Sequence, residues 1–185
     1  MKKAKKNKIT KLHLGCGFEK RPAEQGWINI DIAEEVSPDI VVDIEKGLPF
    51  PDNTFDEIFS QHCLEHIRPE HWRFVLSEIA RVAKPGCILE MILPFDNIST
   101  RTHPDHYRTF TFSSWDQYTD EDILRSYYST LGLHRIEPKP NKIYRIFCAL
   151  FPLMKNSIHF KFSIIKKKEG KEKEEEHIRI DLPPH

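Results

Sequence analysis

Three short segments of the 185-residue chain join an apolar run to a small or acidic residue that could contact a ligand. Gly15 and Gly17 end the run that begins at Ile9, and glycine in such a turn lets a ligand approach the backbone without meeting a Cβ atom. Asp31 ends the next run, where a carboxylate could accept hydrogen bonds from both hydroxyls of a ribose. Asp43 ends the third run and suits an adenine amino group. Because parallel strands end at one sheet edge, these positions predict a single adenosine-shaped crevice.

The elements that must position these residues alternate between short apolar runs and helical patterns, which favours a mainly parallel sheet. We expect strands over residues 9–14, 27–32, 39–42, 55–60, 87–93, 133–137 and 159–165. We expect a helix after Pro69, with Phe74 on its buried face and a stop at residues 84–86, and a second helix over 120–131 with Thr119 as its N-cap. The predicted fold is a single Rossmann-like α/β domain with a doubly wound, mainly parallel sheet and an antiparallel last strand.

The two ends of the chain differ in composition from the domain predicted over residues 9–166. Residues 1–8 are lysine-rich and predict a flexible basic arm, and residues 167–185 predict a charged tail. The formal net charge of zero argues against a chain-wide footprint for nucleic acid. Four scattered cysteines indicate small buried thiols in a reducing compartment. No apolar run approaches the length of about 20 residues that spans a bilayer, so we expect a soluble, cytoplasmic protein.

Five segments carry a resemblance to a known family. In order and spacing, LHLGCG, NIDI, VVDI, LPFPDNTFDEIFSQHCLEHI and EIARVAKPGCILEMILP resemble class I S-adenosylmethionine-dependent methyltransferases. Among these, the chain is similar to the small methyltransferase type 11 group, over residues 9–166 and most strongly over 9–94. The resemblance implies S-adenosylmethionine as the cofactor and direct displacement of its methyl group by an acceptor.

The resemblance also implies a set of cofactor-binding positions at or just after the ends of the first four strands. They are Leu14, Gly15, Cys16, Gly17, Asp31, Ile32, Asp43, Ile44, Gln61, His62 and Leu64. Within this set the glycine turn, with its backbone neighbours, would line the methionine part of the cofactor. Asp31 would hold the ribose hydroxyls, and Asp43 with Ile44 would contact the adenine.

The chain departs from the family pattern at two places. His13 stands in the first strand where the family usually has an acidic residue, and Phe18 stands where a third glycine often follows. The segment from Phe18 to Gly26 contains Pro22 and is too short for a full helix. We therefore expect the first crossover to be a turn or loop.

The segment HCLEH places His62 and His66 four residues apart with Glu65 between them, a spacing that zinc peptidases use. Those enzymes also need a distant glutamate ligand and a longer chain, and their motif does not follow a nucleotide-binding type of sheet. We therefore expect Glu65 and His66 to pack or cap at a helix start, and we expect no metal at the site.

Residues 94–118 form a long polar and aromatic segment after the fifth strand, near where an acceptor would lie. His103 and His106 are the candidate acid–base residues there, with anchoring of a lid over the cofactor as the alternative. Methyl transfer can also proceed by alignment alone, without a dedicated base. The apolar run 144–154 could pack in the core, line an acceptor pocket, or rest on a membrane surface or a partner.

These observations predict a methyltransferase that acts on a small-molecule, sugar or lipid-precursor acceptor. The alternatives are a non-catalytic module that binds the same cofactor and a nicotinamide-dependent oxidoreductase. The second is disfavoured because the turn lacks the full GxGxxG that opens a helix toward a pyrophosphate. The sequence specifies neither the acceptor nor the oligomeric state.

Overall fold

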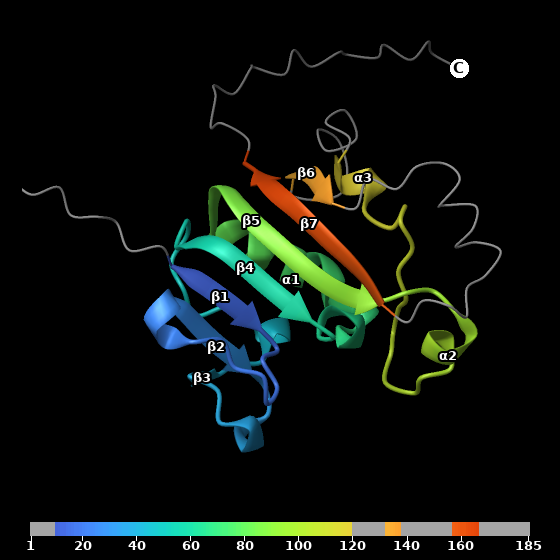
Figure 1. Ribbon diagram of the computed structural model, residues 1–185, viewed down its shortest axis with the longest axis horizontal. Coiled ribbons are helices and arrows are strands. Elements are labelled where there is room, and N and C mark those ends of the chain that lie inside the picture. The colour runs from blue at the N-terminus through green and yellow to red at the C-terminus, as the bar shows by residue number, and fades with distance from the viewer. Residues whose placement is uncertain (1–9, 120–131, 138–156, 167–185) are drawn as a thin grey trace, which may run out of the picture.

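The computed structural model describes residues 10–119, 132–137 and 157–166, which form a seven-stranded sheet in the order β3-β2-β1-β4-β5-β7-β6 (Figure 1). The strands are β1 Lys11–Leu14, β2 Trp27–Asp31, β3 Ile40–Val41, β4 Phe55–Gln61, β5 Ala83–Pro94, β6 Gly132–Glu137 and β7 Ser157–Ile165. The strands β1 to β5 pair in parallel with one another, and β7 runs antiparallel to both β5 and β6. The predicted Rossmann-like α/β fold, mainly parallel with an antiparallel last strand, is confirmed.

Strand register sorts the side chains into an apolar and a more polar face. Leu12, Ile58, Leu89 and Phe162 are aligned across β1, β4, β5 and β7, and all four are fully buried. Burying each such side chain contributes about 1.5–3 kcal/mol, so this row fixes the register. His13 is one residue further along β1, so its side chain points to the opposite face of the sheet. The polar ring therefore lies beside the strand ends on that face.

The long helix α1, Trp72–Val82, lies behind the sheet in Figure 1. It follows the predicted start at Pro69 and buries Val75 against the core. The expectation that Phe74 lies on the buried face is wrong, because its side chain is 43% exposed. Phe74 sits beside the main apolar stripe and packs its ring edge near Gly47 instead.

The predicted stop at residues 84–86 is also wrong, because β5 begins at Ala83, directly after the helix. Ala83 already pairs with Phe55, and the ladder then shifts register before Glu57 pairs with Ile88. The residues between Ala83 and Ile88 therefore form an irregularity within β5, and they do not separate the helix from the strand by a loop.

Short 3-10 turns replace long helices in the first three connections. They span Ala23–Gln25, Glu34–Val36 and Ile44–Lys46, and the first confirms the predicted short crossover. The segment after β5 contains two short helices, α2 Ile98–Arg101 and α3 Asp116–Thr119.

Several predicted segments lie outside the described residues, namely the arm 1–8, the helix 120–131, the apolar run 144–154 and the tail 167–185. Thr119, predicted as the N-cap of the second helix, is the last residue of α3. None of the described helices is long and apolar enough to span a membrane.

The turn after β1 places two glycines in the left-handed region, Gly15 at φ 62° and Gly17 at φ 51°. A Cβ atom on Gly15 would lie 2.6 Å from both Cβ and Sγ of Cys63, whereas one on Gly17 would meet no atom within 4 Å. The turn therefore rests directly against the segment that follows β4, and only glycine allows that approach.

This contrast predicts different effects of the same substitution two residues apart. Gly15→Ala should lower the free energy of unfolding by about 2–4 kcal/mol, because it adds a clash to the left-handed strain. Gly17→Ala should lower it by only about 1–2 kcal/mol, from strain alone. Urea unfolding of both variants measures the difference, and equal losses would show that Cys63 does not press against the turn.

Candidate functional site

A cleft of about 1010 Å³ opens where the carboxyl ends of β1, β2 and β4 meet, at the point where the strand order reverses. Most of the predicted cofactor-binding residues line it, namely Gly15, Cys16, Gly17, Asp31, Ile32, Asp43, Ile44, Gln61 and His62. The other two predicted positions, Leu14 and Leu64, are fully buried in the core and are not among the described residues that line the cleft.

Asp31 ties the glycine turn to the end of β2. Its Oδ2 accepts a hydrogen bond from the Gly17 amide at 2.8 Å, and its Oδ1 accepts one from the Ala33 amide at 3.0 Å. The Cys16 amide also donates to the Ile30 carbonyl at 3.0 Å. A carboxylate oxygen can accept more than one hydrogen bond, so both oxygens of Asp31 retain capacity for a ligand.

Asp43 begins the 3-10 turn Ile44–Lys46 after β3. Its Oδ1 accepts a hydrogen bond from the Glu45 amide at 3.1 Å, and its Oδ2 lies 3.1 Å from the Lys46 ammonium. Between the two acidic strand ends lies Ile32, whose side chain is 65% exposed and lines the cleft. The arrangement offers an apolar surface for a flat ring, with carboxylate acceptors on neighbouring strands.

A cluster around His13 also lines the cleft, and no local sequence pattern predicts the partners of this ring. The Arg21 guanidinium lies 3.6 Å from the centre of the Phe59 ring, and His13 Nδ1 lies 3.3 Å from the Asn29 side-chain oxygen. Burial lowers the pKa of His13, so its ring is neutral near pH 7. Where the family usually has a negative charge, this chain therefore has a neutral imidazole near a cation.

The segment after β4 contains a buried carboxylate. The Glu65 side chain is 0% exposed, and its Oε1 lies 3.1 Å from His62 Nδ1. This hydrogen bond raises the pKa of His62, whose backbone has a φ of 49°. As expected, the segment begins a helical turn, Leu64–His66, and Glu65 packs rather than caps, since no side chain caps that turn.

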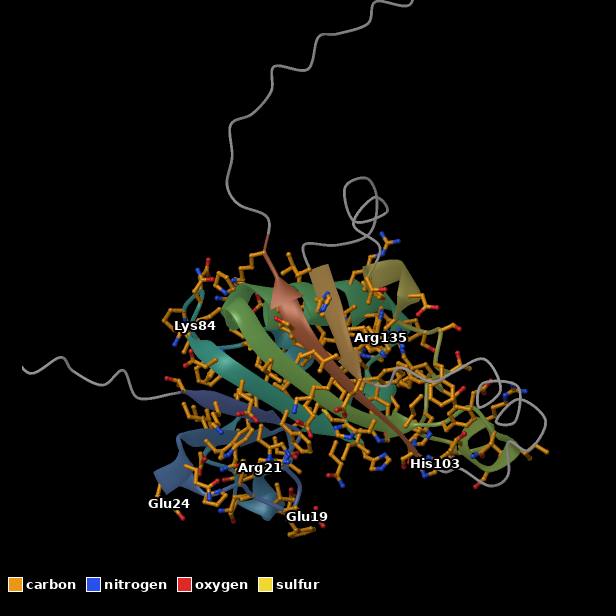
Figure 2. The ribbon with its side chains drawn as sticks, turned by 45° about the horizontal axis from the view of Figure 1, so that its top comes forward. Glu19, Arg21, Glu24, Lys84, His103 and Arg135 are labelled. Carbon is orange, nitrogen blue, oxygen red and sulfur yellow. The ribbon has the colours of Figure 1, made fainter. Side chains whose placement is uncertain are left out.

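The two predicted acid–base histidines lie beside the cleft rather than in it. His103 is exposed and stacks on His106 with ring centres 4.1 Å apart, and neither is among the described residues that line the cleft. Figure 2 shows His103 well to the right of Glu19 and Arg21, which do line it. Burial lowers the pKa of His106, so that ring is neutral as well.

His66 and Tyr107 line the cleft at this end instead. The Tyr107 amide donates to the Glu65 carbonyl at 3.0 Å, which joins the loop after β5 to the segment after β4. The rings of His66 and His106 are in edge contact, with centres 5.1 Å apart. Sequence reasoning missed both lining residues because the contact joins segments far apart in the chain.

Part of the chain, including most of this site, is similar to known proteins. Residues 12–91 match the family model described as a methyltransferase domain. Over these residues the chain is therefore similar to a methyltransferase domain. The matched segment contains the strand ends and the turn that form the cleft.

A curated protein similar to this chain is the probable methyltransferase ltbC of Aspergillus luteorubrus. The two sequences are 35% identical over the 106 aligned residues, and the match covers 42% of this chain. The match spans only 37% of the length of that relative.

Solved structures share the fold of this chain at low identity. An S-adenosylmethionine-dependent methyltransferase from Archaeoglobus fulgidus superposes with a TM-score of 0.56 at 18% identity, covering 88% of this chain and 87% of that one. The Burkholderia thailandensis 1,6-didemethyltoxoflavin-N1-methyltransferase, solved with bound 1,6-didemethyltoxoflavin and S-adenosylhomocysteine, superposes with a TM-score of 0.52 at 14% identity, covering 85% of this chain and 71% of that one.

The lowered pKa of His13 predicts a pH dependence of stability. The folded state favours the neutral ring, so its contribution is fully present above the ordinary pKa of 6.5 and is lost as the pH falls toward the lowered folded value. Between about pH 7.5 and about pH 5.5, wild type should lose more free energy of unfolding than His13→Gln. His134→Gln, on the exposed side of β6, controls for removing an imidazole, and an equal loss in wild type and His13→Gln would contradict the assignment.

Proposed function

We propose that this chain binds S-adenosylmethionine in the cleft and transfers its methyl group to an acceptor. The observation that supports this best is that Gly17, Asp31 and Asp43, from three different strand ends, line one cleft. The described residues suit the cofactor: Gly15 and Gly17 carry no Cβ atom beside the cleft, and Asp31 keeps free acceptor capacity toward ribose hydroxyls. The cleft volume is also ample for a ligand of this size.

Each part of the cleft has a role in holding the cofactor. Asp31 accepts hydrogen bonds from the ribose, and Asp43 accepts one from the adenine amino group. Ile32 covers a face of the adenine, and Phe18, 86% exposed at the cleft, supplies further apolar surface. When bound, S-adenosylmethionine supplies a methyl group on a positively charged sulfur. The chain contributes mainly by fixing the direction from which an acceptor approaches.

We place the acceptor at the end of the cleft lined by His66 and Tyr107. Their ring nitrogens and hydroxyl can orient a polar group on the acceptor or exchange a proton with it. His106 acts through its contact with His66, and His103 acts through its stack on His106. A small molecule, a sugar or a lipid precursor is the acceptor class, in keeping with the zero net charge of the chain.

Isothermal titration of the full chain with S-adenosylmethionine and with S-adenosylhomocysteine tests the proposal. We expect heat and a thermal shift with both ligands. The absence of both heat and thermal shift at about 1 mM ligand would overturn the proposal, since the binding free energy would then be weaker than about −4.1 kcal/mol. Binding without transfer of a labelled methyl group to any fraction of a cell extract would instead favour a non-catalytic binding module.

Asp31→Ala should weaken the binding of S-adenosylhomocysteine by about 1.5–3 kcal/mol, because the ribose hydroxyls lose their charged acceptor. The same change removes two backbone hydrogen bonds, so some loss of stability is expected as well. Asp39→Ala is the matched control, since Asp39 accepts from the Asn29 amide at 2.7 Å in the same region without lining the cleft. Equal affinities of the two variants would show that the ribose assignment is wrong.

A further inference from the structure

Three side chains from two distant segments meet beside the acceptor end of the cleft. Glu65 and His66 belong to the turn after β4, and His106 belongs to the loop after β5. One carboxylate oxygen and one nitrogen from each imidazole all lie within 4.8 Å of one another. Ligands of a tetrahedral zinc ion, each about 2.0–2.2 Å from the metal, lie closer together than this limit, so the three side chains would draw together on binding a metal.

Both imidazoles are held in the tautomer that a metal ligand needs. His66 Nδ1 lies 2.8 Å from the carbonyl oxygen of Asp105, and His106 Nδ1 lies 3.2 Å from that of Thr100. A carbonyl oxygen can only accept, so each Nδ1 carries the proton and each Nε2 keeps a free lone pair. Histidines that bind metals almost always donate their other ring N–H in this way, to a backbone carbonyl or a carboxylate.

The carboxylate of Glu65 provides an independent sign of an absent cation. Its side chain is 0% exposed, and His62 holds Oε1 at 3.1 Å. Its Oε2 is buried and has no hydrogen-bond partner among the described residues. Leaving a buried carboxylate oxygen unpaired costs free energy that a bound cation would offset.

We propose that Glu65, His66 and His106 form a binding site for a divalent first-row transition metal of the Zn²⁺ type. Two imidazoles and one carboxylate favour such a metal over Mg²⁺ or Ca²⁺, which prefer oxygen ligands. Three protein ligands leave a fourth position open. Because His66 lines the cleft, that position takes an oxygen of the acceptor. The role toward the acceptor rests on the proposed function, whereas metal binding does not.

Inductively coupled plasma mass spectrometry and Zn²⁺ titration of the untagged full chain, stripped with a chelator, test the site. We expect one zinc per chain and a loss of affinity of at least about 100-fold in His106→Gln. Glu65→Gln should show a similar loss, and His134→Gln should bind zinc as wild type does. No stoichiometric zinc in wild type, or equal affinity in all variants, would overturn the proposal.

Co²⁺ substitution keeps the test decisive if Glu65→Gln fails to fold. Wild type should show visible absorption bands of coordinated Co²⁺, and His106→Gln should lack them. Acetohydroxamate, a small bidentate oxygen ligand, should shift the bands, and unchanged bands would contradict an open position.

Titration of the same variants with S-adenosylhomocysteine separates the proposed metal site from the proposed cofactor site. We expect His106→Gln to bind S-adenosylhomocysteine as wild type does, so failure of the metal site would leave cofactor binding intact.

Discussion

The hydrogen bonds from the amides of Gly17 and Ala33 to the Asp31 carboxylate hold the turn after β1 against the end of β2. On its other side the same turn rests on Cys63, through the space that Gly15 leaves open. The turn is therefore held between the ends of β2 and β4, the two strands that flank β1, with no side chain at Gly15 or Gly17. The cleft depends on this constraint, because any displacement of the turn would close or reshape the space beside both strand ends.

The rest of the site divides into two ends that different parts of the chain supply. The first three strands and their short 3-10 connections provide acidic acceptors and exposed apolar surface, which suit a nucleoside. The segment after β4 and the loop after β5 provide imidazoles, a tyrosine and the buried Glu65. Backbone hydrogen bonding between Tyr107 and Glu65 joins those two segments, so a ligand position at that end depends on both.

Local patterns were enough to predict which strand-end residues line one cleft. Apolar alternation marked the strands, and the residues that end them, such as Asp31 and Asp43, fall at one sheet edge as the rule for parallel sheets requires. The short first crossover followed from Pro22 and the length of its segment. Each of these patterns lies within a few consecutive residues, so it can be recognised in a single sequence without knowledge of long-range contacts.

Contacts between distant segments could not be predicted in this way. The convergence of His66 with His106 and the stacking of Arg21 on Phe59 depend on how loops fold back onto the sheet. Phe74 was misplaced because an apolar residue beside a helical stripe matches nearly the same periodicity as one within it. The start of β5 was misplaced because a proline and a glycine, normally turn signals, are absorbed here by a shift in strand register.

The central claim is that three strand ends form one adenosine site, and a crystal structure of the full chain with S-adenosylhomocysteine tests it most directly. We expect the ribose hydroxyls within hydrogen-bond distance of Asp31, the adenine amino group at Asp43 and the adenine ring against Ile32. A ligand bound on another face of the molecule, or in the cleft with its ribose away from Asp31, would contradict the account.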